Sequence, residues 1–169
     1  KKLNICVPGR FAKINNTFVN FVNKILINKN INIIFVGEGD YSDLNRNLNK
    51  SLSVQYLMLN YNVSLKTLAN YCDIVLDTFQ FHSGMTAQHM QYFMKPVLSY
   101  RDIDMPNVFK NYRLPELVFD DLSNMKKFIF SLTKNKNILF EYGLRSKKKI
   151  IQSNNLILSK NLNEIRKHL

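Results

Sequence analysis

A turn between an apolar strand and a helix holds the residues best suited to bind an anion. The segment IVLDTF, residues 74–79, is apolar and β-branched, and it predicts a strand covered on both faces. The turn FHSGMT follows it, and a helix comes next. A helix that starts at the carboxyl end of a parallel strand points its free amides outward, so this turn predicts a phosphate site. An ordinary helix N-cap explains the turn equally well. The candidate donors are Ser83, Gly84, Met85 and Thr86.

A second group of candidate phosphate ligands follows the first strand of the chain. In PGRFAK, Gly9 permits a tight turn, and Arg10 and Lys13 can present a guanidinium and an ammonium to the same diphosphate. The alternative is that both are solvated cations of a basic protein. Gly37 and Glu38 belong to a GEG sequence after the next strand. That sequence lacks the third glycine of the dinucleotide-binding fingerprint, so it does not favour an NAD site.

Two histidines lie in or beside the anion-binding turn. His82 is in the turn and His89 follows about one helical turn into the helix, so each is a candidate base or hydrogen-bond donor near neutral pH. A structural role is the more common one for a single histidine. Asp77 lies near the end of the strand, whereas Asp73 at its start is interpreted as a local cap or a solvated residue. None of these residues is assigned as the catalytic group.

These candidates can meet only if strand and helix alternate, so that the strand ends gather at one edge. Apolar runs predict strands at residues 3–8, 31–36, 53–59, 74–79, 97–100 and 117–119. Amphipathic or capped segments predict helices at 15–27, 41–48, 65–72, 87–94 and 125–132, and helix to residue 169 with a break near 153–155. This order predicts the α/β class, with a Rossmann-like parallel sheet and helices on both faces. The loops at 8–15, 37–41, 60–64 and 79–86 should then share one rim.

The composition limits the class of protein. A chain of 169 residues that is 46% hydrophobic predicts a single packed domain, residues 1–169, with C-terminal helices over about residues 121–169. Cys6 and Cys72 have neither the spacing of a zinc site nor that of a disulfide framework. No apolar run reaches the roughly 18 residues of a membrane helix. These features together favour a cytoplasmic protein without a structural metal.

The net charge of +12 is concentrated toward the C-terminal end, where residues 120–169 contain 11 Lys and Arg against 4 Asp and Glu. Lys147, Lys148 and Lys149 could bind polyanions or anionic lipid, although a basic run is more often a solvated helix face. The charge supports an alternative function, a basic Rossmann-like module that binds RNA or an anionic membrane without catalysis. Aromatic residues do not alternate with basic ones as in RNA-binding motifs, which disfavours nucleic acid.

The order of the motifs resembles the C-terminal half of a GT-B glycosyltransferase, the half that binds the nucleotide-sugar donor. The resemblance covers about residues 5–100 and rests on GRFAK, FVGEG, SLKTLANYCD and LDTFQFHSGMT. The last of these is similar to a segment of family 41, which includes O-GlcNAc transferases and bacterial enzymes that glycosylate adhesins. Family 4 has a Glu-x7-Glu motif in this region, and this chain has Phe81 and His89 at those places.

The resemblance implies a site for a nucleotide sugar, most simply a UDP-sugar, held without a metal or other cofactor. The implied diphosphate ligands are Arg10, Lys13, Ser83, Gly84, Met85 and Thr86. The implied nucleoside ligands are Asn60, Asn62 and His89, with Gly9, Gly37, Glu38 and His82 on the same rim. Family 41 usually has an acidic residue at the position of His89 and a lysine at that of Asn62.

The resemblance further implies that a glycosyl group passes to a protein or glycan acceptor, with inversion as in family 41. The acceptor site and the general base are expected on an N-terminal GT-B half outside this sequence, with residues 154–169 crossing back to it. A peripheral membrane contact is compatible with the basic tail. A sugar-nucleotide epimerase of the same fold is a third hypothesis, but it needs catalytic carboxylates and histidines that the sequence does not place.

Overall fold

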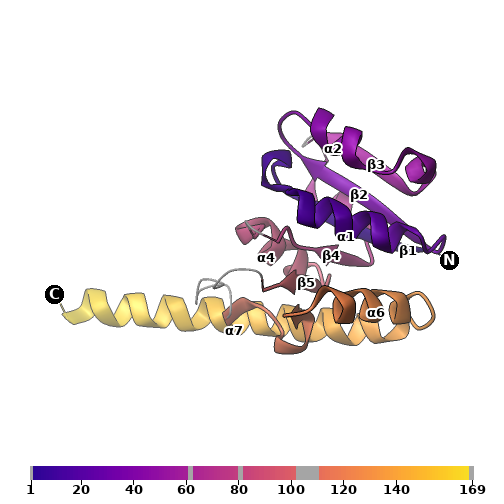
Figure 1. Ribbon diagram of the computed structural model, residues 1–169. Helices are drawn as coiled ribbons and strands as arrows, with labels where there is room; N and C mark the ends of the chain where they lie inside the picture. The colour runs from indigo at the N-terminus through magenta and orange to yellow at the C-terminus, as the bar shows by residue number, and fades with distance from the viewer. Residues whose placement is uncertain (1, 61–62, 80–81, 102–110, 168–169) are drawn as a thin grey trace.

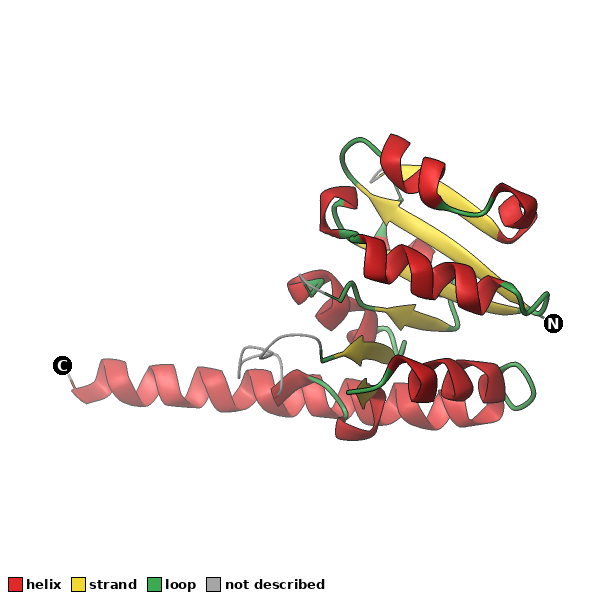
Figure 2. Ribbon diagram, viewed as in Figure 1, coloured by secondary structure: helices red, strands yellow, loops and turns green. Residues whose placement is uncertain are grey.

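A six-stranded sheet in which every pairing is parallel forms the centre of the molecule (Figures 1 and 2). The computed structural model describes residues 2–60, 63–79, 82–101 and 111–167. The strand order is β3-β2-β1-β4-β5-β6. The strands are β1 (Leu3–Pro8), β2 (Ile31–Gly37), β3 (Tyr56–Asn60), β4 (Ile74–Leu76), β5 (Val97–Tyr100) and β6 (Val118–Phe119).

Helices cover both faces of the sheet, as the alternation of strands and helices predicts. They are α1 (Asn16–Leu26), α2 (Ser42–Asn47), α3 (Leu65–Tyr71), α4 (Gly84–Tyr92), α6 (Leu122–Leu132) and α7 (Asn137–Lys167). Short 3₁₀ helices occur at Phe11–Lys13, Lys50–Gln55 and Pro115–Leu117. The larger core includes side chains of α1 and α6, and the smaller core on the opposite face includes side chains of α3 and α4. The prediction of a Rossmann-like α/β fold is therefore confirmed.

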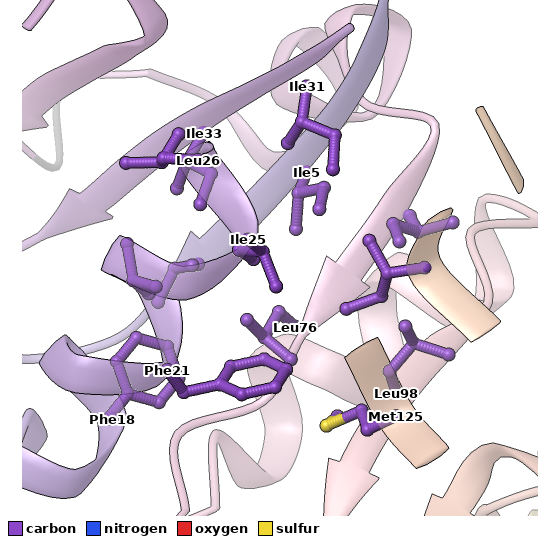
Figure 3. Packing of buried hydrophobic residues seen from close by; sticks show 14 of the residues in the cluster. Ile5, Phe18, Phe21, Ile25, Leu26, Ile31, Ile33, Leu76, Leu98 and Met125 are labelled. Atoms are coloured by element: carbon purple, nitrogen blue, oxygen red, sulfur yellow. The ribbon is translucent and has the colours of Figure 1, made fainter. Parts of the chain in front are cut away.

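The first helix shows how local sequence sets the fold. The Asn15 side chain accepts a hydrogen bond from the Phe18 amide at 2.8 Å and caps α1. Phe18, Ile25 and Leu26 recur on one face of α1 and are completely buried against the sheet (Figure 3). Full burial of each such side chain contributes about 1.5–3 kcal/mol, so this face fixes α1 to the sheet.

Two of the predicted strands are shorter in the structure. β3 starts at Tyr56, not at residue 53, because residues 50–55 form a 3₁₀ helix. The buried Gln55 amide donates to the carbonyls of Leu26 and Ile31 at 2.9 and 3.1 Å, which anchors the end of that helix. β4 ends at Leu76, and the Asp77 amide makes one more hydrogen bond to β5, to the Leu98 carbonyl at 2.9 Å.

The predicted helix break near residues 153–155 is wrong, because α7 continues from Asn137 to Lys167 without interruption. The Ser153 hydroxyl donates to the Asn111 carbonyl at 3.0 Å, so this polar residue makes a tertiary contact within the helix. The C-terminal part of α7 extends beyond the rest of the chain (Figure 1). Within the described residues, none of the helices is both long enough and apolar enough to cross a membrane.

The two cysteines, distant in sequence, meet in the smaller core as free thiols. A hydrogen bond with the Cys72 thiol, together with burial, raises the pKa of Cys6 well above its ordinary value. Both thiols are therefore buried side chains that pack in the core, and the Cys6 thiol is held in the protonated form, which is the unreactive one.

Candidate functional site

The loops after β1 and β2 are locked together at the carboxyl edge of the sheet. The Gly9 amide donates to the Val36 carbonyl at 2.9 Å, and the Phe11 amide donates to the Glu38 carbonyl at 3.0 Å. A Cβ atom on Gly37 would lie 1.8 Å from the Gly9 carbonyl oxygen, so only glycine allows this approach. Gly37 thus serves the packing of two loops, and the Glu38 side chain is exposed beside them.

The loop after β1 also contacts the turn that precedes α4. The Ser83 hydroxyl donates to the Pro8 carbonyl at 2.7 Å, and the Ser83 amide donates to Asp77 Oδ1 at 2.6 Å. Ser83 stands at the N-cap position of α4, but its side chain makes no capping hydrogen bond. Its polar groups therefore hold the turn against the neighbouring loop. Two of the predicted motifs, the PGR loop and the HSG turn, share one rim.

A buried ion pair beneath the turn is the central feature of the site. The Arg113 guanidinium donates to Asp77 Oδ2 at 3.0 Å and to the Gln91 side-chain oxygen at 2.9 Å. The Ser99 hydroxyl lies 3.3 Å from the same carboxylate oxygen and accepts from Arg113 Nε at 3.2 Å. Asp77, Ser99 and Arg113 are almost completely buried. This network connects β4, β5, α4 and the segment before β6.

His82 belongs to the same network. Its Nδ1 atom lies 3.1 Å from Asp77 Oδ2, and its side chain is largely buried. A carboxylate hydrogen-bonded to one ring nitrogen fixes the tautomer and the orientation of an imidazole. His82 is therefore positioned by Asp77, as in the structural role that a single histidine most often has.

The Asp77 carboxylate stays ionised because of its hydrogen bonds. Burial alone would raise its pKa, but the hydrogen bond with His82, the charge of Arg113 and the Ser83 amide together hold the pKa of Asp77 below its ordinary value. The unfolded chain then binds a proton at this group more readily than the folded chain does. The stability that Asp77 provides is present above its unfolded-state pKa of about 4 and is lost as the pH falls below that value.

We therefore expect acid to weaken the fold through Asp77. Urea unfolding followed from about pH 5 to about pH 2 should show stability falling with pH, by up to about 1.4 kcal/mol per pH unit for this one proton. The Asp77→Asn variant should be less stable at neutral pH and should show a shallower dependence below about pH 4. An unchanged slope in that variant would contradict the assignment.

The start of α4 contains the backbone amides of the turn that could bind an anion. Gly84 has a φ of 48°, and the Met85 side chain is exposed. The amides of Gly84 and Met85 belong to the first turn of the helix, where no intrahelical acceptor exists. The Thr86 amide donates to the Ser83 carbonyl at 3.1 Å, so it is used within the turn. The structure thus points to Gly84 and Met85 as the amides best placed for an anion.

The two candidate cations lie in the loop after β1. Arg10 is exposed and immediately precedes the 3₁₀ helix Phe11–Lys13, and Lys13 is half-buried at the end of that helix. Among the residues that the structure describes, neither side chain forms an ion pair with a carboxylate. Both cations are therefore available to bind an anionic ligand.

The predicted nucleoside ligands come from different elements of the fold. Asn60 is the last residue of β3, and His89 is exposed on α4. Asn62 and Phe81 lie outside the described residues. Within residues 2–60, 63–79, 82–101 and 111–167, no group of three or more His, Cys, Asp or Glu side chains is arranged to hold a metal ion.

Comparison with known proteins finds similarity in structure but not in sequence. No protein-family model and no curated protein matches the chain. An O-GlcNAc transferase mutant from Thermobaculum terrenum matches 99% of the chain with a TM-score of 0.79 and 18% identity. A TarM mutant from S. aureus, in complex with fondaparinux, α-GlcNAc-glycerol and UDP, matches 96% with a TM-score of 0.73 and 18% identity. The catalytic domain of a cholesterol-α-glucosyltransferase from Helicobacter pylori matches 89% with a TM-score of 0.67 and 14% identity.

The extent of each match shows how much of these enzymes the chain resembles. The chain spans 36% of the Thermobaculum terrenum structure and 35% of the TarM structure, but 99% of the Helicobacter pylori catalytic domain. The structural neighbours are GT-B glycosyltransferases, and identities below 20% establish the fold alone. The chain therefore has the Rossmann-like fold of one half of a GT-B glycosyltransferase.

Proposed function

We propose that the chain is the donor-binding half of a glycosyltransferase and holds a nucleotide-diphosphate sugar, most simply a UDP-sugar, at the carboxyl edge of its sheet. The observation that carries the proposal is the 2.7 Å hydrogen bond from the Ser83 hydroxyl to the Pro8 carbonyl. This bond joins the loop that contains Arg10 and Lys13 to the turn before α4, where the first helical amides are available. The two candidate groups of phosphate ligands therefore form one proposed site. UDP is present in the TarM mutant complex and in the complex of Alr3699/HepE from Anabaena, which supports the choice of nucleotide.

The proposed chemistry is a metal-independent displacement at C1 of the sugar. Negative charge develops on the diphosphate as the leaving group departs. Arg10, Lys13 and the positive end of the α4 dipole would stabilise that charge. The buried Asp77–Arg113 pair would hold the turn in place, since the Ser83 amide donates to Asp77 and Arg113 donates to the same carboxylate. The resemblance to family 41 favours inversion at the sugar carbon.

The acceptor site completes the proposed enzyme. Since the chain spans about a third of two of the matched enzymes, we assign the acceptor site and the general base to the other half of the GT-B fold. The C-terminal part of α7 extends beyond the sheet, which suits a helix that crosses to that half (Figure 1). The acceptor would be a protein or a glycan.

Calorimetric titration of the chain with UDP, GDP and their sugars tests the proposal. We expect UDP and a UDP-sugar to bind without added divalent cation and with similar affinity when EDTA is present. GDP should bind more weakly, because the proposed nucleoside site is for uridine. Absence of binding by all of these ligands at millimolar concentration would overturn the proposed function.

A further inference from the structure

The outer side of α7 carries apolar side chains that the fold leaves exposed. Phe140, Leu144 and Ile151 have exposed fractions of 66%, 46% and 40%. Their spacings of four and seven residues place them on one side of the helix. The side that faces the protein is packed closely, since a Cβ atom on Gly143 would lie 2.2 Å from the Met94 carbonyl oxygen. The apolar stripe on α7 is therefore a second, outward face of an already packed helix.

The end of α4 extends this stripe into a patch. Tyr92 has an exposed fraction of 51%, and Met94 follows it with a φ of 61°. Met94 lines a hollow of about 410 Å³ together with Leu144 and Ile151, and it lines the neighbouring hollow together with Phe140. Two helices thus contribute to one apolar surface. We call it the α4–α7 patch, and it consists of Tyr92, Met94, Phe140, Leu144 and Ile151.

Lysines border the patch. The Lys147 ammonium lies 5.0 Å from the centre of the Tyr92 ring, and Lys147 and Lys148 both line the hollow that contains Leu144. Lys95 lines the hollow that contains Phe140, together with the Lys136–Asp73 ion pair, whose two charges offset each other. Between residues 137 and 157 of α7 the sequence has four basic residues and one acidic residue, Glu141. The α4–α7 patch thus consists of apolar side chains with lysines at its border.

We propose that the α4–α7 patch binds the surface of an anionic lipid membrane. Apolar side chains bordered by lysines are suited to the interface of a bilayer, where the side chains enter the acyl boundary and the ammonium groups meet anionic headgroups. A nucleic acid would use the lysines but not the aliphatic side chains between them. Because α4 begins at the proposed donor rim and the patch lies at its other end, membrane binding would leave that rim open. The inference does not depend on the proposed function.

Co-sedimentation with vesicles tests the proposal. The chain should bind phosphatidylcholine vesicles that contain phosphatidylglycerol, bind pure phosphatidylcholine weakly, and lose binding as salt is raised. Lys147→Glu with Lys148→Glu should lower the partition coefficient at least about tenfold. Leu144→Ser with Ile151→Ser should also lower it, and over the salt range in which the original chain binds this fold-change, unlike that of the charge change, should not shrink as salt is raised.

Matched controls separate the patch from general charge and hydrophobicity. Lys24→Glu with Lys29→Glu makes the same change in charge on another face, and Ile27→Ser with Leu57→Ser removes two other exposed apolar side chains. Both controls should bind vesicles like the original chain, and circular dichroism should show all four variants folded. Failure of the original chain to bind anionic vesicles at low salt would overturn the proposal. Equal binding of vesicles by the patch variants and the control variants would also overturn it. The proposal would likewise fail if the patch variants changed only dimerisation of the chain, or only its binding to RNA, and left vesicle binding unchanged.

Discussion

Replacing Arg113 by methionine is expected to lower the free energy of unfolding by about 3–5 kcal/mol, the cost of leaving a buried charge without its partner. The guanidinium donates to Asp77, Gln91 and Ser99 at 3.0, 2.9 and 3.2 Å, and Arg113 is 1% exposed. Methionine fills much of the space but leaves the Asp77 carboxylate in a medium of low dielectric constant. Urea unfolding at neutral pH measures the loss.

Two further variants define what the Arg113 result means. Arg101→Met removes an exposed partner of Asp120, 3.2 Å away, and should change stability by less than about 1 kcal/mol. Adding Asp77→Asn to Arg113→Met should recover part of the loss, because no charge is then buried alone. If Arg113→Met is no more destabilising than Arg101→Met, the pair does not hold the turn.

The elements that form from local sequence could be predicted. The amphipathic helix over residues 15–27 and the capped helix over residues 65–72 are each encoded within a few residues, and the structure confirms both as α1 and α3, with Asn15 and Ser64 at their N-caps. The parallel order follows from the alternation of strands and helices, since such connections bring each new strand back in the same direction. The predicted start of β3 and the predicted break in α7 were wrong, because tertiary contacts of Gln55 and Ser153 determine the structure at these places.

The candidate site could be predicted only in part. The loops of Gly9 and Ser83 share the rim that the topology predicts, and the Ser83 hydroxyl bonds to the carbonyl of Pro8, 75 positions away. No local pattern indicates that Arg113, 36 residues after Asp77, is the buried partner of that carboxylate. An aspartate at the end of an apolar strand was the only signal, because a buried carboxylate requires a cation that the sequence alone does not identify.

Replacing Arg10 and Lys13 together by alanine is expected to weaken UDP binding about 100-fold. A hydrogen bond to a charged group contributes about 1.5–3 kcal/mol, so each side chain accounts for about a factor of ten or more. Both cations lie in the loop that the Ser83 hydroxyl joins to the start of α4, and neither is paired with a carboxylate among the described residues. Isothermal titration calorimetry with UDP measures the change, and titration with uridine, which lacks phosphate, should show little difference between variant and original chain.

The control for that variant is Lys24→Ala with Lys29→Ala, which removes the same number of positive charges from the end of α1 and the segment after it. Its UDP affinity should stay within about twofold, since exposed charges that are distant from the ligand are screened by salt. The two variants then separate a local diphosphate contact from the general attraction of a chain with a net charge of +12. Equal weakening in both variants would mean that overall charge attracts the nucleotide, and Arg10 and Lys13 would lose their assigned role.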